Sequence, residues 1–441
     1  MAKLPPGPRF RVPTTYEIAT RPVAHLLEWF EEYGDPMLLR ALNGDVFTTA
    51  DPELIKQIFA NRDPDLFRPF AVEATEPIFG DRSVLAMFGD EHKRERKLLM
   101  PPFHGERMRA YGTVMTEAAR QAFAAIGPGE EFLGLDVGTA ISLEAIIRAV
   151  FGVTGDELLA QHRRAVAGTL DAVKPAFIFT KKLQVAPFGL GPWAAYEKIS
   201  REFDDLLYAQ IEAVRGQTEG REDILSLMLE ARYEDGEAMT DKHIRDELRT
   251  LLFAGHETTA LTLAWALFSI HHYDGVLERL REEVDGAGDD PDPEELARLP
   301  YLGAVVDETL RRFPIVEIVF RVLRKPWTFG GYDLPEGMSV AAAIPAVHLS
   351  PKIYPEPYEF RPERFLDGKP KPYEYLPFGG GNRRCIGAAF SLFESRVALA
   401  TALREFEFEL LDTEVPAIER RSVTLGPAGG VRLRMVGRRR A

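Results

Sequence analysis

Stretches in which apolar residues recur every three or four positions dominate the chain, and this spacing predicts helices. Such patterns fill roughly residues 90–100, 104–126, 140–151, 155–173, 192–216 and 222–232. A longer one runs from Thr240 or Asp241, either of which suits an N-cap, to about His272. At ~1.5 Å per residue, that helix would span roughly 45 Å and cross a whole domain.

Strand patterns are fewer than helix patterns. Residues 37–49 alternate around Asn43-Gly44, which predicts a hairpin, and a helix pattern begins at Asp51-Pro52. A second β-rich part covers about 319–345, with a turn at 335–337. The remaining long segments are predicted to be loops: 63–89, 174–191, 285–295 and the proline-rich 348–377. Because no repeat or linker divides the chain, we predict a single domain over residues 1–441, mainly α with a small β part.

Composition narrows the classes of function. Hydrophobic residues make up 45% of the chain and charged residues 28%, so there is ample material for a globular core. The net charge of −14 disfavours nucleic acid as a partner. We find no signal peptide, and the longest nearly apolar run, Ala260 to Ile270, is too short to cross a bilayer. A lone cysteine suits a reducing compartment, so we expect a cytoplasmic protein with no membrane span.

The only cysteine, Cys385, lies in the most distinctive stretch, which runs from Phe378 to Gly387. Three glycines precede it, Arg383 and Arg384 stand directly before it, and an apolar helical pattern follows from Ala388. Neighbouring cations and a helix N-terminus lower the pKa of a thiol. We therefore predict a thiolate that acts either as a nucleophile or as a metal ligand.

Other interpretations of this cysteine explain less. A buried cysteine acting as a small hydrophobe would not account for the glycines and arginines. A cysteine phosphatase would need an arginine six residues further on, where Ser391 stands. A phosphate-binding loop would end in Gly-Lys-Ser/Thr, and this stretch has no lysine.

The predicted long helix is interrupted by a polar segment, Ala254-Gly255-His256-Glu257-Thr258-Thr259. A glycine within a helix costs roughly 1 kcal/mol relative to alanine, and a buried carboxylate is unfavourable unless it is paired or used. A zinc-protease helix is excluded because position 260 is alanine. Two interpretations stay open: a kinked helix whose threonine bonds to the preceding turn, or an acid and an alcohol placed for chemistry.

Five positions of the cysteine stretch match F-x-x-G-x-R-x-C-x-G, and there the chain resembles a cytochrome P450. These positions are Phe378, Gly381, Arg383, Cys385 and Gly387. Further family motifs follow the same order along nearly the whole chain. The segment 254–258 resembles the oxygen-activation motif A/G-G-x-D/E-T, Glu308 and Arg311 resemble E-x-x-R, and 362–365 resembles the later arginine segment.

The resemblance implies a cytochrome P450 fold, haem b as cofactor and a role for each matching residue. Cys385 would ligate the iron, Thr258 and Glu257 would be catalytic, and Glu308, Arg311 and Arg364 would form a structural ion-pair network. The resemblance places the other cofactor contacts at His92, Arg96, Arg321, Arg383, Phe378, Gly387 and Ala254, of which His92 and the three arginines would meet the haem propionates.

The implied activity is that of a soluble, bacterial-type haem-thiolate monooxygenase that acts as a monomer. It would hydroxylate or epoxidise an apolar small molecule (a fatty acid, terpenoid, steroid or macrolide-like compound) with O₂. Electrons would come from NAD(P)H through a reductase and a ferredoxin-type partner. Exposed cations at Lys93, Arg94, Lys97 and Arg384 would suit an acidic ferredoxin, although a solvated helix face explains them equally well.

Apolar residues near these motifs are expected to line the substrate pocket: Phe79, Phe88, Phe179, Ile315, Val316 and Ile318. Glu317, between two of them, would meet a polar group of the substrate, lie in solvent, or pair with Arg321 or Arg324. Two rival functions stay open. One is a peroxide-driven or isomerase-like relative, and the other is a haem protein that senses a ligand without turnover. An apo cysteine hydrolase is a third, more distant alternative.

Overall fold

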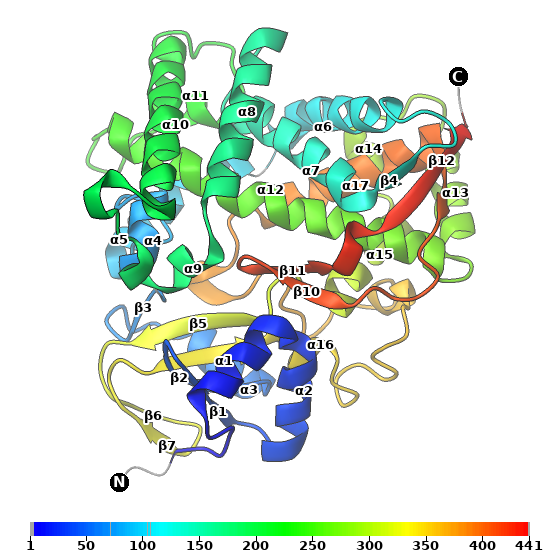
Figure 1. Cartoon of the computed structure of the whole chain (residues 1–441). Helices are drawn as coiled ribbons and strands as arrows, with labels where there is room; N and C mark the ends of the chain where they lie inside the picture. The colour runs from blue at the N-terminus through cyan, green and yellow to red at the C-terminus, as the bar shows by residue number, and fades with distance from the viewer. Residues whose placement is uncertain (1–3, 71, 104, 106, 440–441) are drawn as a thin grey trace.

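The computed structural model describes residues 4–70, 72–103, 105 and 107–439, and within this part it leaves out the side chains of residues 175 and 179. Helices gather around the long helix α12 (Asp241–His272), and a smaller part that contains the largest sheet lies below them (Figure 1). The other α-helices are α1 Arg11–Thr20, α2 Pro22–Tyr33, α3 Pro52–Phe59, α4 Val72–Phe79, α5 Gly89–Leu99, α6 Arg107–Ala124, α7 Gly134–Ala145, α8 Asp156–Ala172, α9 Pro175–Phe179, α10 Pro192–Val214, α11 Ile224–Glu230, α13 Val276–Gly286, α14 Pro293–Ala297, α15 Pro300–Arg312, α16 Ile344–His348 and α17 Ala388–Glu405. A π-helical turn, Ile146–Val150, extends α7, and short 3₁₀ turns cover Pro101–Phe103, Lys181–Leu183, Pro187–Gly189, Pro362–Phe365, Gly381–Arg383 and Ala428–Gly430.

Helix α12 begins where the sequence predicts, because the hydroxyl of Thr240 accepts a hydrogen bond from the backbone N–H of His243 at 3.2 Å. Its second half is apolar on all sides, and this part lies in the largest hydrophobic cluster together with residues of α6, α15 and α17. By length and composition, α12 could also cross a membrane; 72% of its most apolar window is buried inside the protein. The core helix of a globular domain passes the same test of length and composition, and it is buried in the same way.

Small residues let α7 cross α12 at close range. A Cβ atom at Gly138 would lie 2.7 Å from the carbonyl oxygen of Ala260, so only glycine fits there. One turn further along, the Ser142 hydroxyl donates a hydrogen bond to the carbonyl of His256 at 2.9 Å. The α7–α12 crossing therefore fixes the position of the polar segment of α12.

The smaller part is built on a five-stranded sheet with the order β1-β2-β8-β5-β3. The predicted hairpin is present, with Met37 opposite Thr48 and Ala41 opposite Gly44. Strand β8 pairs with β2 in parallel and with β5 antiparallel, so the second β-rich part joins the first in one sheet. The strands are β1 Met37–Ala41, β2 Gly44–Thr49, β3 Phe67–Arg68, β5 Ile318–Leu323 and β8 Ser339–Ala343, with a separate hairpin of β6 Trp327–Phe329 and β7 Tyr332–Leu334.

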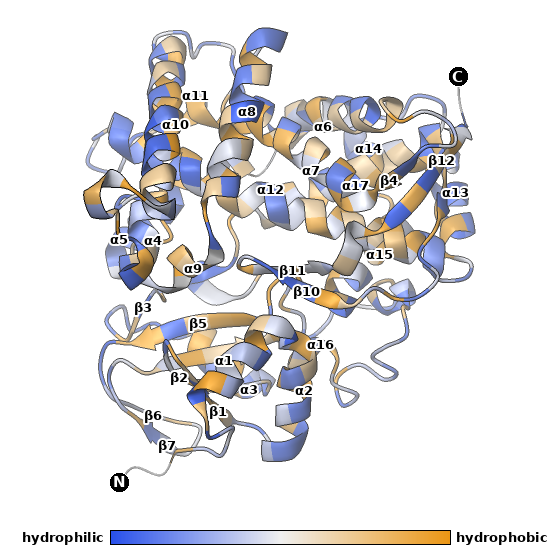
Figure 2. Cartoon of the chain, in the orientation of Figure 1, coloured by the Kyte–Doolittle hydropathy of each residue, from blue (hydrophilic) through white to orange (hydrophobic). Residues whose placement is uncertain are grey.

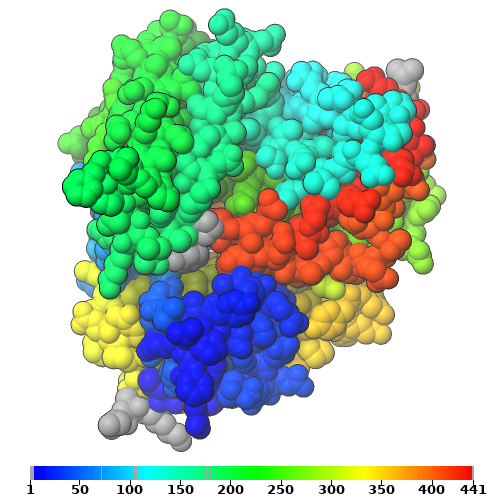
Figure 3. Space-filling view, in the orientation of Figure 1, coloured from blue at the N-terminus to red at the C-terminus, as the bar shows by residue number. Residues whose placement is uncertain are grey.

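The C-terminal strands lie between the helical part and the N-terminal part (Figure 3). Two small sheets form there, one with the order β4-β12-β9 and the other a hairpin, β10-β11. The sequence prediction missed both. Their strands are β4 Glu131–Leu133, β9 Phe406–Leu410, β10 Ile418–Arg421, β11 Thr424–Pro427 and β12 Arg432–Arg438.

The predicted loops contain more helix than expected. Helix α4 lies within 63–89, and α9 and two 3₁₀ turns lie within 174–191. The acidic stretch 285–295 holds the end of α13 and the start of α14, where Asp292 and Glu295 form a capping box. Figure 2 shows the mixture of hydrophilic and hydrophobic positions along α10, whose buried residues recur at helical spacing as predicted.

Candidate active site

The cysteine loop is closed by its own backbone. The N–H of Cys385 donates to the carbonyl of Phe378 at 2.9 Å, and that of Arg384 donates to the carbonyl of Gly381 at 3.1 Å. A Cβ atom at Gly381 would lie 1.8 Å from the carbonyl oxygen of Phe59, the last residue of α3. Glycine is therefore required where the loop lies directly on the end of α3.

The thiol of Cys385 has an exposed surface although protein surrounds it closely. Burial raises its pKa, and this effect outweighs a hydrogen bond from the Gly387 backbone and the cations of Arg96 and Arg384, which lower it. The predicted lowering of the pKa is therefore wrong for the chain on its own. Of the two arginines expected to lower this pKa, Arg384 does so, together with Arg96, but both effects are weaker than desolvation. Cys385 is thus accessible but closely surrounded by protein, so it lies in a recess. This position suits a residue that ligates a large cofactor.

Three arginines and a histidine, from α5, β5 and the cysteine loop, influence one another electrostatically. His92 (α5) is 6% exposed, and burial together with Arg383, Arg96 and Arg321 lowers its pKa to about 3. Burial and Arg383 lower the pKa of Arg321 (β5) to about 9, and burial and Arg96 lower that of Arg383 to about 10. Within the part of the chain that the structure describes, none of the three arginines forms an ion pair with a carboxylate. The cluster is therefore a buried concentration of positive charge suited to carboxylates from a bound group.

Two of these arginines, Arg321 and Arg383, are held by backbone carbonyls instead. Arg321 donates to the carbonyl of Phe320 at 2.7 Å, and its guanidinium lies 5.3 Å from the centre of the Phe59 ring. Arg383 donates to the carbonyl of Met87. An accessible thiol, a glycine-lined loop and an uncompensated cationic cluster together fit a flat metal-bearing group that carries two carboxylates, as the haem predicted from sequence does.

The polar segment of α12 remains regular helix. The Thr258 hydroxyl donates to the carbonyl of Ala254 at 2.9 Å, which is the back-bonding expected for a threonine within a helix. Ala254 is exposed although most of α12 is buried. The next hydroxyl, that of Thr259, lies 3.1 Å from the hydroxyl of Ser391 and so links α12 to α17.

Glu257 is only partly exposed, and burial raises its pKa. A hydrogen bond with Thr424 and the charge of Arg421 oppose this rise. Both residues belong to the β10-β11 hairpin, so a C-terminal element that the sequence prediction missed lies beside the predicted acid.

The expected ion-pair residues lie together. The guanidinium of Arg311 bonds both carboxylate oxygens of Glu308, at 2.6 and 2.8 Å, and both side chains are fully buried. Arg364 approaches the same carboxylate at 3.5 Å, and the N–H of Arg361 donates to it at 2.8 Å. Further bonds from Arg311 to the carbonyls of His348 and Pro357 fix the segment that leads to the cysteine loop.

The residues expected to line the substrate pocket separate into groups. Phe79 lies edge-on to Phe253, at 5.5 Å between ring centres, next to Ala254. The sequence analysis did not single out Phe253, although its place directly before Ala254 was a usable signal. Val316 is partly exposed, and Phe88 is 39% exposed beneath the guanidinium of Arg324.

Ile315 and Ile318 do not join the Phe79–Phe253 wall. Ile315 packs in the largest core cluster, and Ile318 packs in the cluster formed by the sheet and α2. The two residues therefore belong to different core clusters, and their contact with a substrate stays a prediction. The side chain of Phe179 lies outside the part that the structure describes.

Glu317 pairs with none of the partners expected for it. It forms an ion pair with Arg420 of β10, and both side chains are largely buried. Arg420 also donates to the carbonyl of Ile18 in α1 at 3.2 Å. Glu317 therefore joins the sheet to the C-terminal hairpin, and its charge is neutralised by the protein.

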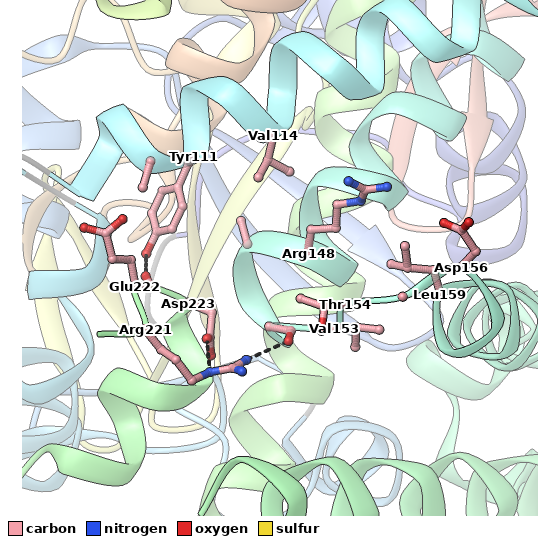
Figure 4. A pocket seen from close by; sticks show the side chains of 14 residues that line it. Tyr111, Val114, Arg148, Val153, Thr154, Asp156, Leu159, Arg221, Glu222 and Asp223 are labelled. Carbon is pink, nitrogen blue, oxygen red and sulfur yellow. Dashed lines mark hydrogen bonds and ion pairs between the residues drawn. The ribbon is translucent and has the colours of Figure 1, made fainter. Parts of the chain in front are cut away.

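A cavity of 430 Å³ lies elsewhere, between α6, the π-helical turn and the segment before α11 (Figure 4). Several of its polar groups bond within the protein: Tyr111 donates to the carbonyl of Glu222 at 3.0 Å, and Arg221 pairs with Asp223 at 2.8 Å. No residue expected to form the active site lines it.

Comparisons with known proteins agree with this geometry. The model of the family Cytochrome P450 matches residues 5–433. Cytochrome P450 138 of Mycobacterium bovis is 35% identical over 455 aligned positions, which cover 99% of this chain and 97% of the relative. Cytochrome P450 137 of Mycobacterium tuberculosis is 35% identical over 412 positions, covering 93% of this chain and 84% of the relative.

Two solved structures share the fold over their whole length. The haem domain of cytochrome P450DA matches with a TM-score of 0.84 at 25% identity and covers 100% of this chain and 99% of its own. Cyanobacterial CYP120A1, solved with retinoic acid bound, matches with a TM-score of 0.83 at 21% identity over 99% of each chain. The fold and the site thus define a haem-thiolate monooxygenase, and the chain belongs to the cytochrome P450 family. Its cofactor is haem, bound through a thiolate.

Proposed function

We propose that this cytochrome P450 inserts one atom of O₂ into an apolar small molecule, by hydroxylation or epoxidation. The substrate classes that suit the site are fatty acids, terpenoids, steroids and macrolide-like compounds. The protein would act as a single-domain monomer in the bacterial cytoplasm. The observation that carries this proposal is the intact pair Glu257 and Thr258, next to the exposed Ala254 on a helix that is otherwise largely buried.

The haem would be held by residues from four segments, namely α5, α12, β5 and the cysteine loop. Cys385 would supply the thiolate, and Phe378, Gly387 and Ala254 would contact the haem. His92, Arg96, Arg321 and Arg383 would bind the propionates, whose negative charges would offset the mutual repulsion of these arginines. When bound, the thiolate-ligated haem supplies the activation of O₂.

Thr258 would place its hydroxyl beside the position where O₂ reacts, and Glu257 would deliver protons to that position. Because burial raises the pKa of Glu257, its carboxyl holds a proton more readily than an exposed one does. Its contact with Thr424 and Arg421 links it to the C-terminal hairpin, which supports a proton route along that side of α12.

The chemistry of the pocket favours an apolar substrate. The Phe79–Phe253 pair stands beside Ala254 and is part of a cluster with Ile78, Phe177 and Trp193. Glu317 is neutralised by Arg420, which leaves it no free charge for a substrate group. Binding would therefore rest on the burial of apolar surface.

For electron supply we propose a ferredoxin-type donor and its reductase, drawing on NAD(P)H. Two cations of the expected basic surface are already paired with carboxylates of the chain. Arg94 pairs with Asp235, and Lys97 pairs with Glu234 at 2.5 Å. In the described part of the chain Lys93 and Arg384 are exposed and form no ion pair, so these two cations are the ones available to a donor.

The test is a visible spectrum of the purified, reduced protein under carbon monoxide, followed by titration with an apolar compound library. We expect the strongly red-shifted Soret band of a thiolate-ligated haem and high-spin shifts with apolar ligands. Turnover with NAD(P)H, ferredoxin and reductase should then give an oxygenated product. Turnover with peroxide alone, or binding without turnover, would instead favour the two rival functions.

A further inference from the structure

A second cluster of ligand-type side chains lies between α5 and the first half of α12. Glu95 comes from α5, and His243 and Glu247 come from α12, where their spacing of four residues puts them on one face. The three side chains are buried, at 3%, 9% and 0% exposure. One ligand atom from each lies within 4.8 Å of the other two. The haem site proposed above uses none of them.

Tyr233 orients two members of this cluster. Its hydroxyl donates to Oε2 of Glu95 at 2.7 Å and lies 3.3 Å from Nδ1 of His243. Because that hydroxyl proton is given to Glu95, the hydroxyl oxygen accepts from His243, which places the imidazole proton on Nδ1. Nε2 then presents its lone pair to the centre of the cluster, as the nitrogen of a metal-binding histidine does.

Two carboxylate oxygens in the cluster have no partner. Oε1 of Glu247 accepts a hydrogen bond from the N–H of Val84 at 2.6 Å, whereas Oε2 of Glu247 and Oε1 of Glu95 are buried without any hydrogen bond among the described residues. Nε2 of His243 lies 3.1 Å from Oε2 of Glu95 but makes no hydrogen bond with it. Unpaired buried carboxylate oxygens are costly, and native structures rarely leave them so.

We propose that Glu95, His243 and Glu247 bind one divalent transition-metal ion, and that Zn²⁺ is the ion their donor set fits best. Zinc takes imidazole nitrogen and carboxylate oxygen at about 2.0–2.2 Å, which brings ligand atoms to roughly 3.3 Å from one another. The charge of the ion balances two carboxylates, so the buried cluster becomes neutral. Imidazole disfavours Mg²⁺ and Ca²⁺, which prefer ligands made entirely of oxygen.

The site would fasten together elements that surround the haem. Glu95 is next to Arg96, one of the proposed propionate partners, and Glu247 precedes Ala254 on α12. The loop that carries Tyr233 is also fixed to α5, where the guanidinium of Arg94 lies 4.2 Å from the centre of the Tyr233 ring. The bound ion would therefore hold α5, α12 and this loop in one arrangement.

The experiment uses the full-length, haem-loaded protein from zinc-supplemented medium, desalted and analysed for metals by mass spectrometry. We expect about one zinc per chain in addition to haem iron. Glu247→Gln and Glu95→Gln should each lose this zinc. Glu91→Gln is the matched control, because Glu91 lies one turn before Glu95 on α5 and is exposed; it should keep the zinc.

Thermal unfolding gives a second readout. Removal of zinc by a chelator should lower the Tm of the wild type and of Glu91→Gln, added Zn²⁺ should restore it, and the Tm of Glu247→Gln should respond to neither. If the cluster holds only protons, Gln at position 247 replaces a neutral carboxyl of the same shape, and wild type and variant respond alike. That outcome would overturn the proposal, as would a zinc content that Glu95→Gln and Glu247→Gln leave unchanged.

Discussion

The guanidinium groups of Arg321 and Arg383 repel each other within the candidate haem site. Burial and this repulsion lower the pKa of Arg321 to about 9. A propionate placed between them would remove the repulsion and satisfy both charges. Replacing either arginine by leucine should therefore weaken haem retention by about 1.5–3 kcal/mol, or roughly 10- to 100-fold in affinity.

The measurement is the rate of haem transfer from each variant to an excess of apomyoglobin. Arg324→Leu is the control, because Arg324 lies at the end of the same sheet but pairs with Asp65 at 3.1 Å. If Arg321→Leu and Arg383→Leu release haem no faster than Arg324→Leu, these arginines do not bind the propionates.

Replacement of Thr258 by alanine should separate electron consumption from product formation. Its hydroxyl bonds only to α12 carbonyls in the described structure, at 2.9 Å to Ala254 and 3.4 Å to Gly255, so its loss leaves the helix intact. We expect NAD(P)H use to continue while most of the electrons leave as hydrogen peroxide. The neighbouring Thr259→Val serves as control, because that hydroxyl faces Ser391 of α17. Full coupling in Thr258→Ala would count against the proposed role.

Local motifs could be predicted from the sequence because their residues are close in the chain. Glu308 and Arg311 lie one helical turn apart, so their pairing follows from spacing alone. The partners that complete the site are distant in sequence: Glu257 meets Thr424, and Glu317 meets Arg420. No periodicity indicates such contacts, since they depend on where the C-terminal hairpin packs.

Two kinds of local signal were available but were overlooked. Helix α13 has buried Val276, Leu280 and Val284 at helical spacing, although its many charges obscured the pattern. Apolar and polar residues alternate along strand β12. Its Arg434 pairs with Glu131 and Glu409 of the neighbouring strands, at 3.1 and 3.0 Å. The raised pKa of Cys385 could not be predicted, because burial depends on the whole fold whereas the adjacent arginines are visible in the sequence.

The buried Glu308–Arg311 pair should dominate the stability of the region before the cysteine loop. Glu308→Gln removes the charge and leaves Arg311 uncompensated in the core, which we expect to lower the free energy of unfolding by about 3–5 kcal/mol. The exposed pair Glu294–Arg298 has the same chemistry at 2.7 Å, so Glu294→Gln is the control and should cost less than about 1 kcal/mol. Urea unfolding followed by tryptophan fluorescence measures both, and similar losses in the two variants would contradict the assignment of the buried pair as structural.

His348 should make stability depend on pH. Its Nε2 accepts a hydrogen bond from the N–H of Leu376 at 2.8 Å, and burial together with Arg311 lowers its pKa from 6.5 to about 3. Between these values the unfolded chain binds a proton that the folded chain does not. Neutral His348 therefore makes its full contribution to the free energy of unfolding above pH 6.5. This contribution decreases by about 1.4 kcal/mol per pH unit as the pH falls from 6.5 toward 3.

His348→Gln keeps a hydrogen-bond acceptor and removes the titrating group. The variant should be less stable than the wild type at pH 8, and the difference should shrink steadily as the pH falls from 6.5 to 4.5, because only the wild type loses the histidine contribution. Urea midpoints at half-unit pH intervals provide the measurement. Parallel stability curves for the two proteins would mean that His348 binds a proton equally well in the folded and unfolded chains, and that its hydrogen bond to Leu376 does not hold it neutral.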